Sequence, residues 1–229
     1  VRVFKEAHPN IVLVLLEGWS SHLIKPLGGS DSITPNFNSL CEEGLLFTNF
    51  LATGGRSDQG ITGLLSGFPA QPTTSVTHQP SKYPGLPSFP KRLKPYGYSS
   101  LFVFGGELNY ANIRSFLMHV GIQKLVEEQH FDNAVPRAKL GVHDEHLYPR
   151  FIEEINLLTP PFFAISFNLS SHAPYDIPVP YKFSWGGRHN GYINSVYYAD
   201  SCLGQFMEDA SKQPWYHHTL FIITSDHSH

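Results

Sequence analysis

Short apolar runs alternate along the chain with segments in which apolar residues recur at helical spacing. The runs are short enough to be strands and carry few polar residues, a pattern typical of strands that are buried on both faces. The pattern predicts strands at Asn10–Leu16, Leu45–Ala52, Ser99–Phe104, Phe162–Asn168 and Thr219–Thr224. Their alternation with helices predicts an α/β fold: a doubly wound, mostly parallel sheet with helices on both faces.

Capping and breaking residues set the boundaries of the predicted helices. Thr34 followed by Pro35 is a typical helix start, and Gly44 is a typical stop. Similar reasoning predicts helices at Pro35–Glu43, Pro87–Pro95, Asn112–Val120, His143–Leu158 and Asn190–Lys212, and one that begins just after Ser57. Two long loops, Gly67–Gly85 and Ser171–Gly191, have a length that is usually functional in a compact domain. No break in composition divides the chain, so we expect a single domain over residues 1–229.

Composition excludes several classes of protein. The net charge is −3 and no run of Lys and Arg is longer than Lys91–Arg92, so we expect no nucleic-acid partner. The longest apolar stretch, Ile11–Leu16, is far shorter than the roughly 20 residues that cross a bilayer. Cys41 and Cys202 lie far apart and have neither a second cysteine nor a histidine pair at zinc-finger spacing.

Polar residues with catalytic chemistry follow four of the predicted strands. They are Glu17, Ser57, the pair Ser171–His172 and the pair Asp226–His227. In a doubly wound sheet, ligands bind beyond the carboxyl ends of the strands. We therefore expect these side chains to converge on one edge of the sheet.

The residue types at this edge suit a divalent metal and an activated hydroxyl. Glu17, Asp226 and His227 form a mixed oxygen and nitrogen ligand set that suits Mn²⁺ or Zn²⁺, and Mg²⁺ less well. A hydroxyl beside such an ion loses its proton near neutral pH and becomes a nucleophile. Ser57 is the candidate hydroxyl, because the preceding Gly54 and Gly55 allow a sharp turn into a helix whose positive end attracts anions.

Each of these residues also has a purely structural explanation. Glu17 taken alone fits a solvated loop residue, Asp226 a capping residue in a turn, Ser57 a helix N-cap and His172 a hydrogen-bonded loop histidine. Their coincidence at four strand ends favours a functional site.

The order of these motifs resembles one known family. The run Pro9–Glu17, then Gly-x-Arg-Ser-Asp at 54–58, then Ser-His-x-Pro-Tyr at 171–175, then Asp226-His227, is similar to the sulfatase-type domain of the lipoteichoic acid synthase and phosphoglycerol transferase group. This group belongs to the alkaline phosphatase superfamily. The resemblance covers nearly the whole chain.

The resemblance implies a role for each residue. Glu17, Ser57, Asp226 and His227 would bind one divalent metal, manganese ahead of magnesium or zinc. Ser57, where the family usually has threonine, would attack phosphorus and form a covalent phospho-enzyme. An acceptor alcohol or water would then resolve this intermediate, and His172 would contact the substrate.

The sequence departs from the family in three places. Where the family holds phosphoglycerol with an aromatic residue and an arginine, this chain has Ala111 and Ile113, and Arg114 is the adjacent substitute. We expect Arg114 to bind substrate together with Arg56 and His172. The Cys/Ser-x-Pro-x-Arg signature from which sulfatases make formylglycine is absent around Ser57, which predicts against ordinary sulfatase activity. Family domains also continue beyond the metal motif, so we expect that the C-terminal part of the domain is missing after His229.

The sequence therefore predicts a metal-dependent phosphoryl transferase that acts on a phospholipid headgroup or a phosphorylated glycan of the cell envelope. A phosphodiesterase, a phosphatase or another sulfatase-family hydrolase on the same site is the first alternative, and an inactive binding module is the second. By resemblance, we expect an extracytoplasmic domain that upstream helices tether to the membrane.

Overall fold

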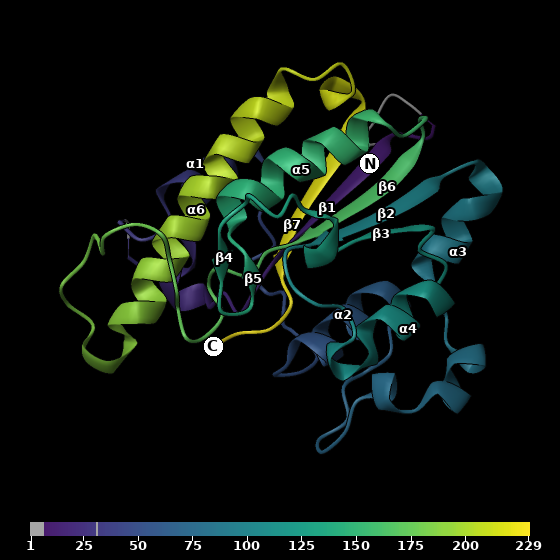
Figure 1. Ribbon diagram of the computed structural model, residues 1–229, viewed down its shortest axis with the longest axis horizontal. Helices are drawn as coiled ribbons and strands as arrows, with labels where there is room; N and C mark the ends of the chain where they lie inside the picture. Colours follow the sequence, from purple (N-terminus) through teal and green to yellow (C-terminus); the bar gives the residue numbers. More distant parts are fainter. Residues whose placement is uncertain (1–6, 31) are drawn as a thin grey trace.

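The computed structural model describes residues 7–30 and 32–229 and has a parallel five-stranded sheet at its centre (Figure 1). The strand order is β3-β2-β6-β1-β7, and all neighbouring pairs are parallel. The strands are β1 (Asn10–Leu16), β2 (Ser99–Phe104), β3 (Lys124–Val126), β6 (Phe162–Phe167) and β7 (Thr219–Ser225). A small antiparallel pair, β4 (Arg137–Ala138) and β5 (Gly141–Val142), lies apart from this sheet.

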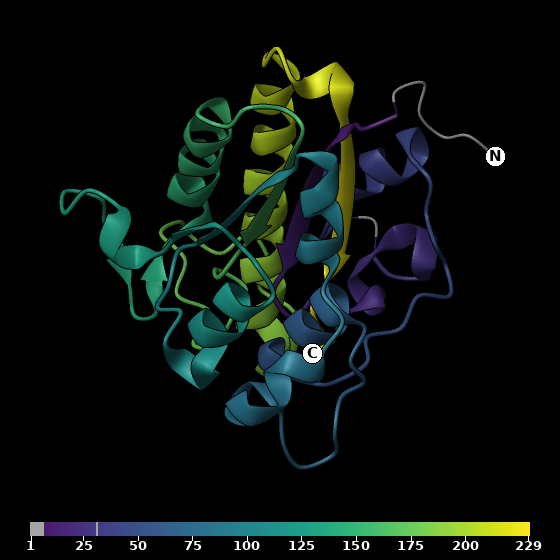
Figure 2. The same ribbon diagram turned by 90° about the vertical axis from the view of Figure 1, so that its right-hand side faces the viewer.

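Helices cover both faces of the sheet (Figures 1 and 2). They are α1 (Pro35–Glu43), α2 (Ser57–Ser66), α3 (Phe89–Leu93), α4 (Ile113–His119), α5 (Asp144–Asn156) and α6 (Asn190–Ser211). Short 3-10 turns connect several of these elements. The arrangement confirms the predicted α/β fold with a mostly parallel sheet between helical layers.

Alternate residues of β1 enter two separate hydrophobic cores. Val12, Val14 and Leu16 pack with residues of α5 and α6, whereas Leu13 and Leu15 pack with residues of α2 and α4. Every residue of β1 is buried. Burial on both faces explains why the strand has a continuous apolar sequence rather than an alternating one.

The predicted strand at Leu45–Ala52 is wrong. This segment has no regular secondary structure, and Leu45 and Leu51 are 79% and 81% exposed. The segment has a composition typical of strands, but composition alone does not form a strand, because strand preference depends on packing against neighbours. None of the described residues pairs with this segment in a sheet. β3 was not predicted, since three residues are too few to give a pattern. The other predicted strands and helices form within a few residues of their expected bounds.

Candidate active site

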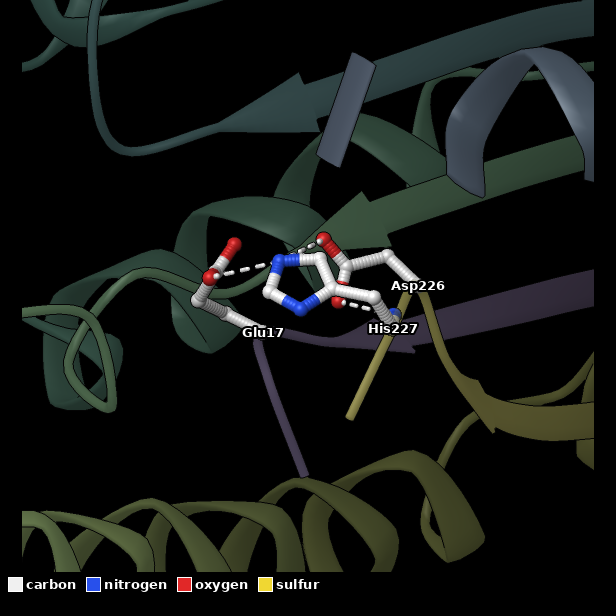
Figure 3. A group of neighbouring side chains, drawn as sticks. All are labelled: Glu17, Asp226 and His227. Carbon is white, nitrogen blue, oxygen red and sulfur yellow. Dashed lines mark hydrogen bonds and ion pairs between the residues drawn. The ribbon is translucent and has the colours of Figure 1, made fainter. Parts of the chain in front are cut away.

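Glu17, Asp226 and His227 meet at the carboxyl ends of two neighbouring strands (Figure 3). Glu17 directly follows β1, and Asp226 and His227 follow β7. His227 Nε2 lies 3.4 Å from Glu17 Oε1 and 3.6 Å from Asp226 Oδ2. Glu17 and Asp226 are 4% and 1% exposed, so two acidic residues lie together in a buried position.

Ser57 joins this cluster from the N-terminus of α2. Its Oγ donates a 3.0 Å hydrogen bond to Glu17 Oε2 and lies 3.5 Å from His227 Nε2. The close approach of α2 depends on Gly60, since a Cβ at that position would lie 2.7 Å from the carbonyl carbon of Asp226. Ser57 therefore reaches the predicted position although no strand precedes it.

The backbone around the cluster is held by hydrogen bonds to Asp226. Gly18, with a φ of +65°, donates its N–H to Asp226 Oδ1 at 2.9 Å. The N–H of His227 donates to the same oxygen at 2.8 Å. One oxygen of Asp226 is thus fixed by the main chain, and the other faces the cluster.

The three groups shift one another's pKa. Burial would lower the pKa of His227, but its interaction with Glu17 and the charge of Asp226 raise it to about 9. Burial and the neighbouring Glu17 carboxylate raise the pKa of Asp226 to about 7. Burial would raise the pKa of Glu17, but the hydrogen bond and positive charge of His227 lower it. A positive charge is therefore favoured at this position.

The donor set fits a divalent metal. One ligand atom from each of Glu17, Asp226 and His227 lies within 4.8 Å of the others. Asp226 Oδ2 is buried and accepts no hydrogen bond from the described residues, although a buried carboxylate oxygen is normally paired. A cation at this point would satisfy that oxygen, and carboxylate and imidazole ligands suit manganese or zinc.

The cluster opens into a cavity of about 370 Å³. Besides Glu17, Ser57 and His227, its lining includes Arg56, His172, His78, Tyr110 and Tyr175. The structure thus brings Arg56 and His172 to the same cavity as Ser57. His172 is exposed, and its Nδ1 lies 2.7 Å from the carbonyl oxygen of Ala173.

One predicted residue lies outside this cavity, and one residue that was not predicted lies in it. Arg114 does not line this cavity; its guanidinium pairs with the buried carboxylate of Glu127 and donates to Asn109 Oδ1, and its predicted role in substrate binding stays a prediction. His78 does line it, and its Nε2 lies 3.7 Å from Asp58. The length of the loop Gly67–Gly85 indicated a function there, but no local pattern singled out His78.

Comparison with known proteins decides the family, because the family model described as Sulfatase matches residues 9–229. The chain belongs to the sulfatase family. Membership confirms the predicted superfamily and the prediction of a sulfatase-superfamily enzyme domain. None of the helices among the described residues is long and apolar enough to cross a membrane.

Relatives within this family are similar over almost all of the chain. Lipoteichoic acid synthase 1 of Bacillus subtilis is 24% identical over 237 residues, which cover 96% of this chain and 36% of that protein. The crystal structure of an alkaline phosphatase superfamily protein from Vibrio parahaemolyticus has a TM-score of 0.89 and 33% identity, over 98% of this chain and 56% of that one. The lipoteichoic acid synthase LtaP of Listeria monocytogenes has a TM-score of 0.81 and 23% identity, over 97% and 57%. The chain thus spans about a third of the curated relative and just over half of the two solved structures.

Proposed function

We propose that this domain transfers a phosphoryl group from a phospholipid headgroup or phosphorylated glycan to an acceptor alcohol, through a covalent phosphoester on Ser57. The observation that carries the proposal is the position of Ser57: its Oγ lies 3.0 Å from Glu17 Oε2, in a cavity that Glu17 and His227 also line. The names of the relatives, lipoteichoic acid synthases, support a phosphoryl-transfer reaction.

Ser57 is prepared for attack by its neighbours. Its hydrogen bond to Glu17 orients the Oγ and gives the proton a route to a carboxylate oxygen. As the first residue of α2, Ser57 stands at a positive helix end, where the phosphate anion is stabilised.

Glu17, Asp226, His227 and Ser57 would hold one divalent metal, with Mn²⁺ preferred over Mg²⁺ and Zn²⁺. When bound, such an ion lowers the pKa of the serine hydroxyl and offsets the negative charge of the phosphate.

In the covalent step, each proton that moves has a donor and an acceptor in the cavity. Ser57 Oγ bonds to phosphorus, the bond from phosphorus to the leaving oxygen breaks, and the serine proton passes to Glu17. His172 protonates the leaving oxygen, and Arg56 contacts the phosphate oxygens as a cation. An acceptor alcohol then reverses these steps, losing its proton to His172 while Ser57 regains its own.

We place this domain outside the cytoplasm, tethered to the membrane by another part of the protein. Support comes from the relatives, whose names describe synthesis of a cell-envelope polymer. A membrane location also suits a phospholipid donor.

The proposal is tested by assaying the domain with a phosphodiester, a phosphomonoester and a sulfate ester, each with Mn²⁺ and with a chelator. We expect Mn²⁺-dependent cleavage of the phosphodiester that is lost in Ser57→Ala and retained in part by Ser57→Thr, which keeps a hydroxyl. Adding glycerol as acceptor separates transfer from hydrolysis, because a transferase forms a new phosphodiester and a hydrolase does not.

Two outcomes contradict the proposal. Cleavage of the sulfate ester alone would exclude phosphate as the substrate class. A folded domain that binds Mn²⁺ and turns over none of the three esters would favour a binding module.

A further inference from the structure

Two residues that follow β6 hold the main chain of Glu17 in place by hydrogen bonds. Its N–H donates to Asn168 Oδ1 at 2.6 Å, and its carbonyl oxygen accepts from Ser171 Oγ at 2.7 Å. Asn168 is fully buried, and Ser171 is 2% exposed. The position of the Glu17 carboxylate at the metal cluster therefore depends on which way the Asn168 amide is turned.

Asp144 fixes that orientation. It is fully buried at the start of α5. Its Oδ2 accepts from Asn168 Nδ2 at 2.8 Å, while its Oδ1 accepts from the N–H groups of Leu169 and Ser170 at 3.0 and 3.2 Å. A carboxylate only accepts, so the NH₂ group of Asn168 must face Asp144 and its oxygen must face Glu17.

We propose that Asp144 is a positioning residue for the metal centre, which acts through Asn168 to hold the main chain of Glu17 where its carboxylate meets Asp226 and His227. The inference rests on the proposed function, because it assumes that this cluster binds a metal. Asp144 touches neither the cluster nor the cavity around Ser57 among the described residues. Its effect on the metal is transmitted by hydrogen bonds alone.

The direction of these hydrogen bonds makes the role testable. In Asp144→Asn, one side of the side chain at position 144 becomes a donor. If the new amide keeps its oxygen towards Leu169 and Ser170, its NH₂ group faces the NH₂ group of Asn168. Turning the Asn168 amide places its NH₂ group against the N–H of Glu17. Turning the amide at position 144 places its NH₂ group against the N–H groups of Leu169 and Ser170.

Exchanging the two residues removes the conflict. In the double variant Asp144→Asn/Asn168→Asp, the amide at 144 accepts from Leu169 and Ser170 and donates to the carboxylate at 168. That carboxylate still accepts from the N–H of Glu17. The exchange therefore restores the hydrogen bonds of the original arrangement. If Asp144 acted only through its size and shape, the exchange would not be expected to restore Mn²⁺ affinity.

The experiment measures Mn²⁺ affinity by titration in the intact chain, the single variant, the exchanged double variant and a control. The control is Asp200→Asn, since Asp200 is also fully buried and accepts from the main chain of Asn36 and Phe37 but has no link to Glu17. We expect Asp144→Asn to weaken Mn²⁺ binding about 10- to 100-fold. The double variant should regain most of that loss, and Asp200→Asn should bind Mn²⁺ as the intact chain does.

The possible failures are distinct. If the intact chain itself binds no Mn²⁺, the proposed function fails. If it binds Mn²⁺ and Asp144→Asn binds equally well, the positioning role is wrong. If Asp144→Asn is too unstable to titrate, the double variant decides alone: affinity near that of the intact chain supports the role, and a folded double variant with tenfold or weaker binding overturns it.

Discussion

Gly60→Ala should damage the proposed metal centre from inside α2. The added methyl would lie 2.7 Å from the carbonyl carbon and 3.0 Å from the Cα of Asp226, with the carbonyl oxygen closer still. All three are backbone atoms, so no side-chain rotation relieves the clash. Since carbon atoms pack at about 3.5 Å or more, α2 and the Asp226 backbone must separate by at least about 0.8 Å.

This displacement should affect metal affinity more than stability. Overpacking costs about 1–3 kcal/mol, but replacing glycine by alanine inside a helix returns about 1 kcal/mol. The net loss of unfolding free energy should thus be about 0–2 kcal/mol. Misplacing Asp226 relative to Glu17 and Ser57 should weaken Mn²⁺ binding about 10- to 100-fold.

Gly63→Ala is the matched control on the same helix. Its methyl meets the hydroxyl of Thr53 at 2.5 Å, and Thr53 is exposed and free to rotate. We expect Gly63→Ala to be neutral or stabilising and to bind Mn²⁺ normally. Chemical unfolding and Mn²⁺ titration of both variants give the two quantities. The reasoning is refuted if Gly60→Ala binds Mn²⁺ as tightly as Gly63→Ala.

Three further predictions concern pH, stability and turnover. Burial would lower the pKa of His227, but Glu17 and Asp226 hold it at about 9, so metal binding must displace a proton below that pH. Mn²⁺ affinity should therefore rise about tenfold per pH unit between pH 7 and pH 8, and more steeply below pH 7, where Asp226 with its pKa of about 7 must also lose a proton. Calorimetry in two buffers measures the released protons, and an affinity independent of pH would contradict this. Burial acts to raise the pKa of Glu154, but Lys124 and Arg150 lower it. The ion pairs of Glu154 therefore stabilise the fold fully at a pH above 4.5, the ordinary pKa of this carboxyl. This stabilisation is lost as the pH falls through the lowered pKa of the folded state. Glu154→Gln should therefore cost about 1–3 kcal/mol at pH 7 and less at about pH 3 in urea unfolding, whereas an equal cost at both would exclude the ion pairs as the cause. His172→Ala should slow phosphodiester cleavage about 100-fold with unchanged Mn²⁺ affinity, and a loss of Mn²⁺ binding would instead assign His172 to the metal.

Buried strands and the cluster beyond them could be predicted because both leave local signals. The apolar run Asn10–Leu16 is buried on both faces in the sheet, and parallel strands carry the residues that follow them to one edge. This geometry is why Glu17, Asp226 and His227 could be grouped although more than 200 positions separate the first from the others.

Features that depend on distant contacts left no such signal. Leu45–Ala52 has the composition of a strand, but a strand also needs a partner, which sequence alone does not supply. The close contact at Gly60 and the hydrogen bond that Asn168 donates to Asp144 join segments that are not adjacent in the chain. A lone glycine in a helix and an aspartate at a helix start are common features, so neither pattern could reveal a link to the proposed metal ligands.

The central claim is that Ser57 carries the phosphoryl group. It is tested most directly by quenching the Mn²⁺-loaded domain in acid during turnover of a phosphodiester and mapping the modified peptide by mass spectrometry. The account predicts a phosphoester on Ser57, absent from Ser57→Ala and from samples treated with chelator. Turnover at an undiminished rate in Ser57→Ala, or a phosphoester on a different residue, would contradict it.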